Sequence, residues 1–285
     1  MLKGTEKLRE KLPDYPGKRL LFIPLLFFIT FIFGLFFLLF SYTITNLFPN
    51  NQFLLALKPV LPIFCQTSLV GIGFFLISRV WARRSHLIDQ TFELAFQRGF
   101  IWGIVGIPLV LAVVMHNFFL VIIPNQPLNT LSGYLFNSII TILDLPQLIS
   151  LIVQSTGIVF LLLGILTGYR ALTTFGVDYM ALIYLYYPEE SELQDHKIYS
   201  VLRHPAYFGL VLVAVGGLFF RLSGYALYTL ILFLIGINLH LILVEEKELI
   251  ERFGDSYRQY KKRVPALMLG SRQVISFLQF ILGRE

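Results

Sequence analysis

The sequence YSVLRHPAYFG, residues 199–209, is followed after two apolar runs by EEKEL at residues 245–249. The two runs, roughly 206–220 and 225–244, are joined by a tight turn at 221–224, so they predict a helical hairpin. Polar groups that could carry chemistry therefore stand at both edges of an apolar hairpin. The apolar runs upstream of residue 199 predict a membrane scaffold.

The composition of the chain predicts an all-α, polytopic membrane protein. Of its 285 residues, 56% are hydrophobic and only 14% are charged, and the mean hydropathy is +0.73. Apolar residues in long blocks with so little charge are typical of transmembrane helices. The net charge of +6 is better explained by membrane orientation than by a nucleic-acid surface. The single cysteine, Cys65, excludes an internal disulfide and a multi-cysteine metal site.

Six apolar runs are expected to cross the bilayer. A seventh piece, 131–143, is short and bounded by prolines, so an interfacial or re-entrant helix is expected there. The second run begins among Lys58, Pro59 and Pro62, which predicts irregular first turns. The predicted spans are 20–48, 54–80, 99–123, 149–171, 206–220 and 225–244.

The distribution of cations predicts the orientation of the chain. The segments 1–19, 79–98, 170–203 and 245–285 hold 21 of the 23 lysines and arginines. Because cationic loops stay in the cytoplasm, both termini are expected there, together with both polar stretches. Residues 1–19 are predicted to lie on the membrane surface with their cations facing lipid headgroups.

Three features at the polar edges suggest chemistry. Pro205 suits the first turn of a helix and places Arg203 and His204 at its mouth. Glu245 and Glu246 end the next span, where two carboxylates beside hydrocarbon are costly unless a cation is near. Asn238 stands seven residues before Glu245 and is expected on the same helix face.

A purely structural interpretation also fits these residues. Arg203 and Glu246 could form an interfacial salt bridge, and the aromatic residues after position 249 could simply pack an amphipathic helix. The histidines His86, His116 and His240 are expected to make local hydrogen bonds. No metal site is predicted, since no two histidines stand at ligand spacing on one helix.

The two-part pattern resembles the integral-membrane methyltransferases, which include isoprenylcysteine carboxyl methyltransferase and the phospholipid N-methyltransferases. The resemblance covers about residues 165–265 and lies in the order of Tyr199, Arg203-His204-Pro205, Tyr207, Gly209, a hairpin, Glu245-Glu246, Leu249, Phe253-Gly254, Tyr257, Tyr260 and Val264-Pro265. The apolar runs and cations divide the rest of the chain into a basic surface arm (1–19), a transmembrane scaffold (20–148) and a tail (266–285), and the resemblance implies a methyltransferase-like core at 149–265.

The resemblance implies S-adenosylmethionine as the methyl donor, entering from the cytoplasm, and a lipophilic small molecule or membrane lipid as the acceptor. It implies that one glutamate of the pair holds a cationic part of the donor, and that Arg203 and Glu246 are candidate catalytic residues. The implied donor-binding residues are Tyr199, Arg203, His204, Pro205, Tyr207, Gly209, Glu245 and Glu246.

Two departures from the family pattern keep alternatives open. Lys197 stands where the family usually has glycine, and Leu239-His240-Leu241 stands where the eukaryotic carboxyl methyltransferases carry an arginine. An NADPH-dependent membrane reductase of the sterol-reductase type, or a non-catalytic membrane scaffold, would also fit a chain of this kind. The sequence leaves the acceptor and the oligomeric state open.

Overall fold

A computed structural model describes residues 3–12, 22–91, 94–119, 127–128 and 130–283, and every regular element in these ranges is helical. The long helices are α2 (Phe22–Leu47), α4 (Leu61–Ala82), α6 (Ala95–Met115), α9 (Gln147–Phe175), α13 (Pro205–Arg221), α14 (Gly224–His240) and α15 (Glu246–Arg263). The shorter ones are α1 (Thr5–Lys11), α3 (Gln52–Leu57), α5 (Arg84–Thr91), α7 (Leu131–Phe136), α8 (Ile139–Ile142), α10 (Val177–Met180), α11 (Ile183–Tyr186), α12 (Ile198–Val201) and α16 (Ser271–Ile281).

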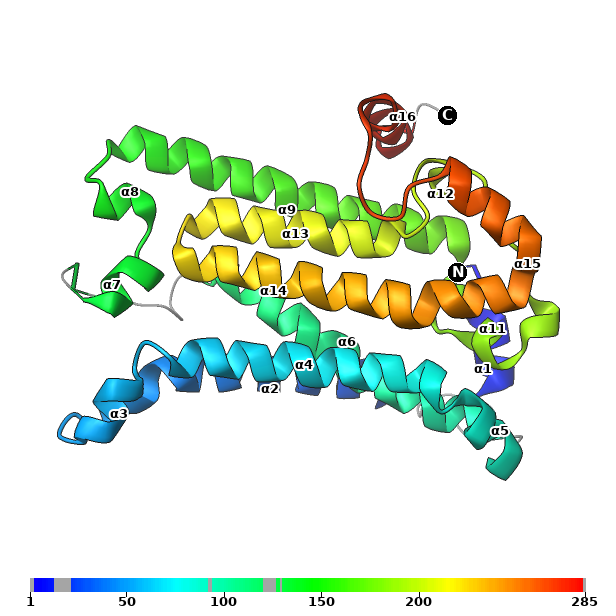
Figure 1. Cartoon of the computed structure of the whole chain (residues 1–285), viewed down its shortest axis with the longest axis horizontal. Coiled ribbons are helices and arrows are strands. Elements are labelled where there is room, and N and C mark those ends of the chain that lie inside the picture. Colours follow the sequence, from blue (N-terminus) through cyan, green and yellow to red (C-terminus); the bar gives the residue numbers. More distant parts are fainter. Residues whose placement is uncertain (1–2, 13–21, 92–93, 120–126, 129, 284–285) are drawn as a thin grey trace.

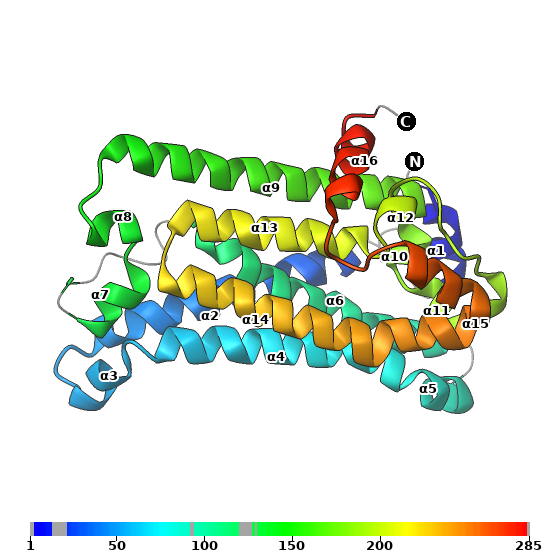
Figure 2. The ribbon, with the colours of Figure 1, turned by 45° about the horizontal axis from the view of Figure 1, so that its top comes forward.

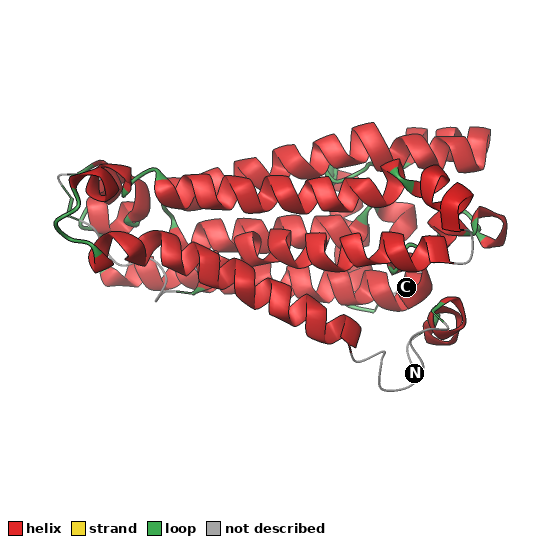
Figure 3. Cartoon of the chain, turned by 90° about the horizontal axis from the view of Figure 1, so that it is seen from below, coloured by secondary structure: helices red, strands yellow, loops and turns green. Residues whose placement is uncertain are grey.

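The long helices form two groups that lie against each other. One group holds α9, α13 and α14, and the other holds α2, α4 and α6 (Figures 1 and 2). Contacts of α14 with α4 and of α13 with α6 join the groups. Seen from below, the helices run along the bundle and the loops gather at its two ends (Figure 3).

Five of these helices are long and apolar enough to cross a membrane: α2, α4, α6, α9 and the continuous stretch Gly224–Arg263. The sixth, α13, has 17 residues, but it packs along α9 and α14. A helix of this length spans about 26 Å, close to the thickness of a bilayer core. The all-helical, polytopic architecture predicted from the composition is therefore confirmed, with α13 as the short member of the hairpin.

The irregular pieces also follow the sequence. Residues 58–60, which include Pro59, separate α3 from α4, so the membrane helix begins only at Leu61, with Pro62 in its first turn. Residues 131–142 form the two short helices α7 and α8, of six and four residues. Neither is long enough to cross a bilayer, and both lie at the end of the bundle far from α15 (Figure 1).

The N-terminal helix contacts protein where lipid headgroups were expected. Lys7 and Lys11 of α1 both pair with Glu190, at 2.7 and 2.9 Å. Leu12, which follows α1, is only 1% exposed, and the backbone N–H of Val177 donates to the carbonyl of Lys3. These two cations thus fasten α1 to the connector between α9 and α13. Residues 13–21 of the predicted surface arm lie outside the described residues.

Candidate active site

The entry to α13 is built as the sequence predicts. His204 is the residue before the helix, and Pro205 occupies its first turn, where a missing N–H costs nothing. The backbone N–H groups of Arg203 and His204 donate to the carbonyls of Pro265 and Ala266. The segment after α15 therefore holds the Arg-His-Pro segment through two backbone hydrogen bonds. These bonds bring the two halves of the sequence pattern together in space.

The imidazole of His204 bridges the two glutamates. Its Nδ1 lies 3.3 Å from Glu245 Oε1, and its Nε2 lies 3.4 Å from Glu246 Oε1. Burial opposes a charge on this ring, but the two carboxylates outweigh burial and raise the pKa of His204 above its usual value. An imidazolium that donates from both nitrogens satisfies both carboxylates.

Glu246 is surrounded by cations. Arg203 Nη2 donates to Glu246 Oε1, and Lys261 Nζ donates to Oε2 at 2.6 Å. The other guanidinium nitrogen of Arg203 donates to the carbonyls of Lys261 and Val264. The side chains of Arg203, His204 and Glu246 are only 4–7% exposed. The salt bridge between Arg203 and Glu246 that the purely structural interpretation expects is therefore present, as one contact of a buried network.

Glu245 faces the neighbouring helices of the hairpin. Tyr207 donates its hydroxyl to Glu245 Oε2 at 2.8 Å, and His240 Nε2 lies 3.6 Å from the same oxygen. His240 and its partner Ser78 were not among the candidate site residues. The expected polar stripe through Asn238 is wrong: this residue is exposed, and its amide donates to the carbonyl of Leu234.

A kink in α15 closes the site. Gly254 has φ +56° and ψ −128°, a backbone conformation that side-chain-bearing residues avoid. The helix therefore turns at its middle (Figure 1) and brings Tyr257, Tyr260 and Lys261 back over the connector. The hydroxyl of Tyr260 donates to the carbonyl of Tyr199 at 2.6 Å.

Tyr199 belongs to an aromatic stack on the connector. Its ring stacks on Phe175 at 4.5 Å, and Phe175 in turn lies 4.3 Å from Tyr179. Burial raises the pKa of Tyr199, so its hydroxyl stays protonated. Lys197, at the family's glycine position, has φ +53° and ψ −129°, so the glycine-like backbone conformation is present even though the residue is a lysine.

Gly209 lies where α13 and α9 approach most closely. A Cβ at Gly209 would come within 2.8 Å of the carbonyl oxygen of Gly164, which is closer than van der Waals contact allows. The structure thus gives Gly209 a packing contact. A role in donor binding through its backbone stays a prediction.

Three buried polar atoms near the glutamates have no hydrogen-bond partner among the described residues: Arg203 Nε, His240 Nε2 and Tyr257 Oη. Buried polar atoms of this kind are costly unless a ligand or water completes them. Together with the carboxylates and the aromatic rings, they suit a ligand that carries both charges, such as an amino-acid moiety.

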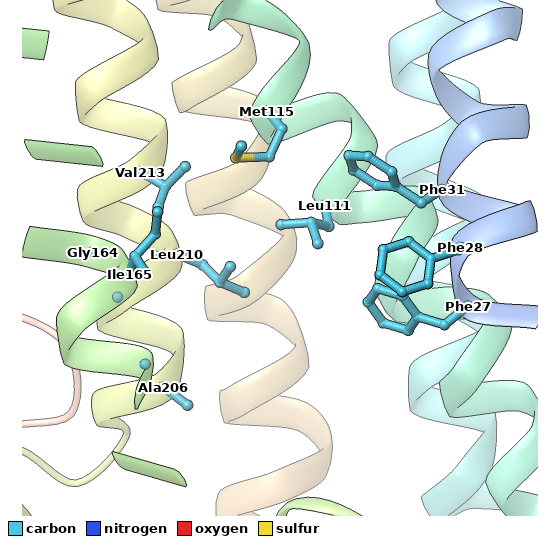
Figure 4. Close-up of a pocket in the computed structure, with 12 residues that line it drawn as sticks. Phe27, Phe28, Phe31, Leu111, Met115, Gly164, Ile165, Ala206, Leu210 and Val213 are labelled. Carbon is cyan, nitrogen blue, oxygen red and sulfur yellow. The ribbon is translucent and has the colours of Figure 1, made fainter. Parts of the chain in front are cut away.

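An apolar cavity of about 360 Å³ adjoins the mouth of α13. It lies between α2, α6, α9 and α13, with Phe28 and Phe31 facing Ala206 and Leu210 (Figure 4). Phe28 is itself 62% exposed, so the cavity is not sealed from its surroundings. Ala206 and Gly209 border it within two helical turns of His204.

The hairpin entered at Arg-His-Pro and left at a glutamate pair lies in a segment that is similar to a class of membrane enzyme. Residues 152–256 match the model of the phospholipid methyltransferase family, and this segment is therefore similar to the integral-membrane methyltransferases. It contains the hairpin and both glutamates, whereas α2, α4 and α6 lie outside it.

Individual relatives agree with this class. The chain is 40% identical over 80 residues to methanethiol S-methyltransferase 1 of Bradyrhizobium diazoefficiens, covering 27% of this chain and 26% of that protein. It is 31% identical over 115 residues to protein-S-isoprenylcysteine O-methyltransferase of Schizosaccharomyces pombe, covering 40% and 48%. The chain thus spans about a quarter to a half of the length of these relatives. No solved structure matches the chain significantly.

Proposed function

We propose that the chain transfers a methyl group from S-adenosylmethionine to the oxygen, nitrogen or sulfur of a lipophilic acceptor. The observation that carries this proposal is the buried cluster in which His204 bridges Glu245 and Glu246. It stands at the hairpin mouth within the segment that matches the family. The buried paired charges suit a polar donor, and the apolar cavity beside them suits a lipophilic acceptor.

The charges of the cluster suit the amino-acid end of the donor. Arg203 and Lys261 both pair with Glu246, and we expect them to bind the donor's carboxylate as well. We expect Glu245 to face the donor's ammonium group. The unpartnered Arg203 Nε and Tyr257 Oη supply further donors. When bound, S-adenosylmethionine supplies a methyl group on a sulfonium sulfur, and the rings of Tyr199 and Tyr207 offer π-faces to that cation.

The residues of this chain need only position and enclose the reactants. Methyl transfer is an in-line displacement, so alignment of the two reactants and exclusion of water supply most of the rate. Arg203 donates from Nη1 to the backbone carbonyls of Lys261 and Val264, and from Nη2 to the carboxylate of Glu246. Arg203 and Glu246 thus fix the geometry of the donor site, in addition to contacting the donor.

The apolar cavity supports a lipophilic acceptor. Its volume of about 360 Å³ lies in the range of small-molecule sites, and its open side along α2 would admit a hydrocarbon chain laterally from the bilayer. The donor would enter at the opposite, polar edge. The concentration of lysine and arginine at this end supports a cytoplasmic location for the site and for both α1 and α16.

The donor site is tested by titrating the purified protein, in detergent, with S-adenosylhomocysteine and with NADPH in separate calorimetric experiments. We expect saturable binding of the first only, and a loss of at least tenfold in affinity in His204→Ala and in Glu246→Ala. His86→Ala, on the exposed α5, is the matched control. Wild-type affinity in both site variants would overturn the assignment, and binding of NADPH alone would favour the reductase.

The acceptor is tested by incubating the protein with a membrane lipid extract and tritiated S-adenosylmethionine, and identifying the labelled product. Label in an extractable lipid or lipophilic small molecule is the expected result. Intact donor binding without any labelled lipophilic product would contradict the proposed acceptor class and leave the donor site standing.

A further inference from the structure

The end of α4 that leads into α5 has two faces with different surroundings (Figure 1). One face supports the candidate active site: Ser78 Oγ lies 2.9 Å from Nδ1 of His240, and Trp81 meets that imidazole edge-on at 5.0 Å. Successive residues of a helix point 100° apart, so Arg79, between these two residues, points elsewhere. Its guanidinium lies against α6.

The guanidinium of Arg79 contacts two aromatic rings. Its central carbon is 4.6 Å from the centroid of the Trp102 ring on α6 and 5.5 Å from that of Phe75, one turn earlier on α4. Both distances are typical of cation–π interactions. The Nε of Arg79 is buried and has no hydrogen-bond partner among the described residues. The rings therefore hold the cation in place and leave its hydrogen-bond donors unused.

The position of Arg79 along α4 places it where the helix leaves the hydrocarbon. With 22 residues, α4 is about 33 Å long, slightly more than the roughly 30 Å of a bilayer core. Arg79 stands three residues before the end of the helix, and tryptophan, its partner on α6, is typical of this depth. Phe75 is 58% exposed, so this contact lies on the outside of the bundle, where lipid is expected.

Two further arginines extend this face beyond the hydrocarbon. Residues four positions apart share a helix face, so Arg83 follows Arg79 on α4 and Arg98 precedes Trp102 on α6. The two helices pack along each other and run in opposite directions, so both steps lead toward the same end of the bundle. Arg83 and Arg98 are both exposed. The three arginines thus line one side of the α4–α6 pair.

These arginines lack the carboxylates that other cations at this end of the bundle have. In the part of the chain that the structure describes, no ion pair or side-chain hydrogen bond engages Arg79, Arg83 or Arg98. The contrast is with Lys7 and Lys11, which pair with Glu190, with Arg84, which pairs with Glu248, and with Arg203 and Lys261, which pair with Glu246. The protein therefore leaves the charge of the α4–α6 face to be balanced from outside.

We propose that Arg79, Arg83 and Arg98 form a binding site for the headgroup of an anionic phospholipid, whose acyl chain lies along Phe75. A phosphate presents two oxygens to the planar donors of a guanidinium. Uncompensated arginines at headgroup level attract anionic lipid, whereas the ammonium group of a zwitterionic headgroup is repelled by them. The bound lipid stabilises the end of α4 that contacts the candidate active site. This inference is independent of methyl transfer.

Lipid preference is tested by native mass spectrometry of the full chain in detergent, titrated with equal amounts of phosphatidylglycerol and phosphatidylcholine. Each arginine near an anionic headgroup contributes a factor of about five in affinity. We therefore expect tighter binding of phosphatidylglycerol by about fivefold or more, and Arg79→Gln should reduce this preference by about fivefold. Arg258→Gln, which removes an exposed arginine paired with Asp255, is the control and should keep the preference. An Arg79→Gln variant with the wild-type preference overturns the proposal.

Photocrosslinking locates the bound lipid. A phosphatidylglycerol with a diazirine next to its glycerol backbone should label peptides that contain residues 75–83 and 98–102. An excess of unlabelled phosphatidylglycerol should remove this label, and the same excess of phosphatidylcholine should not. Label confined to other helices, or removed equally by both lipids, contradicts the site.

Thermal unfolding tests the site without any variant. A ligand that binds only the folded protein raises its melting temperature, so dioctanoyl-phosphatidylglycerol should raise that of wild type by about 2–4 °C more than dioctanoyl-phosphatidylcholine does. Glycerol 3-phosphate at the same concentration should have no effect, because the contact with Phe75 requires an acyl chain. Equal shifts with both lipids argue against an anionic site, and a shift with glycerol 3-phosphate argues against a lipid.

Discussion

Lys261 Nζ lies 2.6 Å from Glu246 Oε2, although the two residues are 15 positions apart in α15. In a straight helix they would be about 22 Å apart. The kink at Gly254 closes this distance. The positive φ of one glycine is therefore what brings a second cation to the glutamate pair.

Replacing Gly254 with alanine should destabilise the closed site. A Cβ finds open space at this position, so the penalty is conformational, about 1–3 kcal/mol for a strained backbone. We expect a lower melting temperature in detergent and weaker binding of S-adenosylhomocysteine. Lys261→Met is the control, because it removes the ion pair and leaves the kink. A Gly254→Ala variant with the wild-type melting temperature would contradict this account.

Lys197 has almost the same backbone angles as Gly254, but it carries a side chain. Lys197→Gly should therefore relieve strain and raise the free energy of unfolding by about 1 kcal/mol, after the entropic cost of a glycine is subtracted. Lys197→Ala keeps the strain and should show no gain. If alanine stabilised as much as glycine, the side chain and not the backbone would be the cause.

The stability of the protein should depend on pH through His204. The pKa of His204 is raised in the folded state despite its burial, by the carboxylates of Glu245 and Glu246. Its stabilising contribution is thus complete below the unfolded pKa of about 6.5 and is lost as the pH rises through the higher folded value. Melting temperatures measured from pH 6 to 9 should fall more steeply in wild type than in His204→Gln. Parallel curves would argue against an imidazolium here.

The attachment of α1 to the connector should weaken in acid. Hydrogen bonds from Lys7 and Lys11 lower the pKa of Glu190 below its usual value, so this contribution is present above the unfolded pKa and is lost as the pH falls through the folded one. Glu190→Gln should cost about 1 kcal/mol or less, as partly exposed ion pairs do. Hydrogen exchange of the backbone amides of α1 should then become faster, and Glu189→Gln, its neighbour, should leave the rate unchanged.

Hydropathy was enough to predict the membrane helices and their order, because each long apolar run has only one way to satisfy its backbone in lipid. The two halves of the pattern, Arg203-His204 and Glu245-Glu246, were predicted to border one site, and the structure places them in contact. Their roles in binding and catalysis stay predictions.

Other contacts could not be read from the sequence. The partnership of His240 with Glu245 depends on a π turn at Leu241–Glu245, and a helical count places those residues on different faces. The hydrogen bond between Ser78 and His240 joins residues 162 positions apart, and the sequence around neither residue predicts it. The sequence shows the lysines of α1, but it does not show that they pair with Glu190, because that contact depends on the path of the connector between α9 and α13.

The close approach of Trp81 to His240 gives this protein an internal optical probe. The chain has only two tryptophans. Trp102 lies over the guanidinium of Arg79, and Trp81 meets the imidazole edge-on at 5.0 Å. The fluorescence of a Trp102→Phe variant therefore reports from a single position, the contact between α4 and α14 beside this imidazole, without any label.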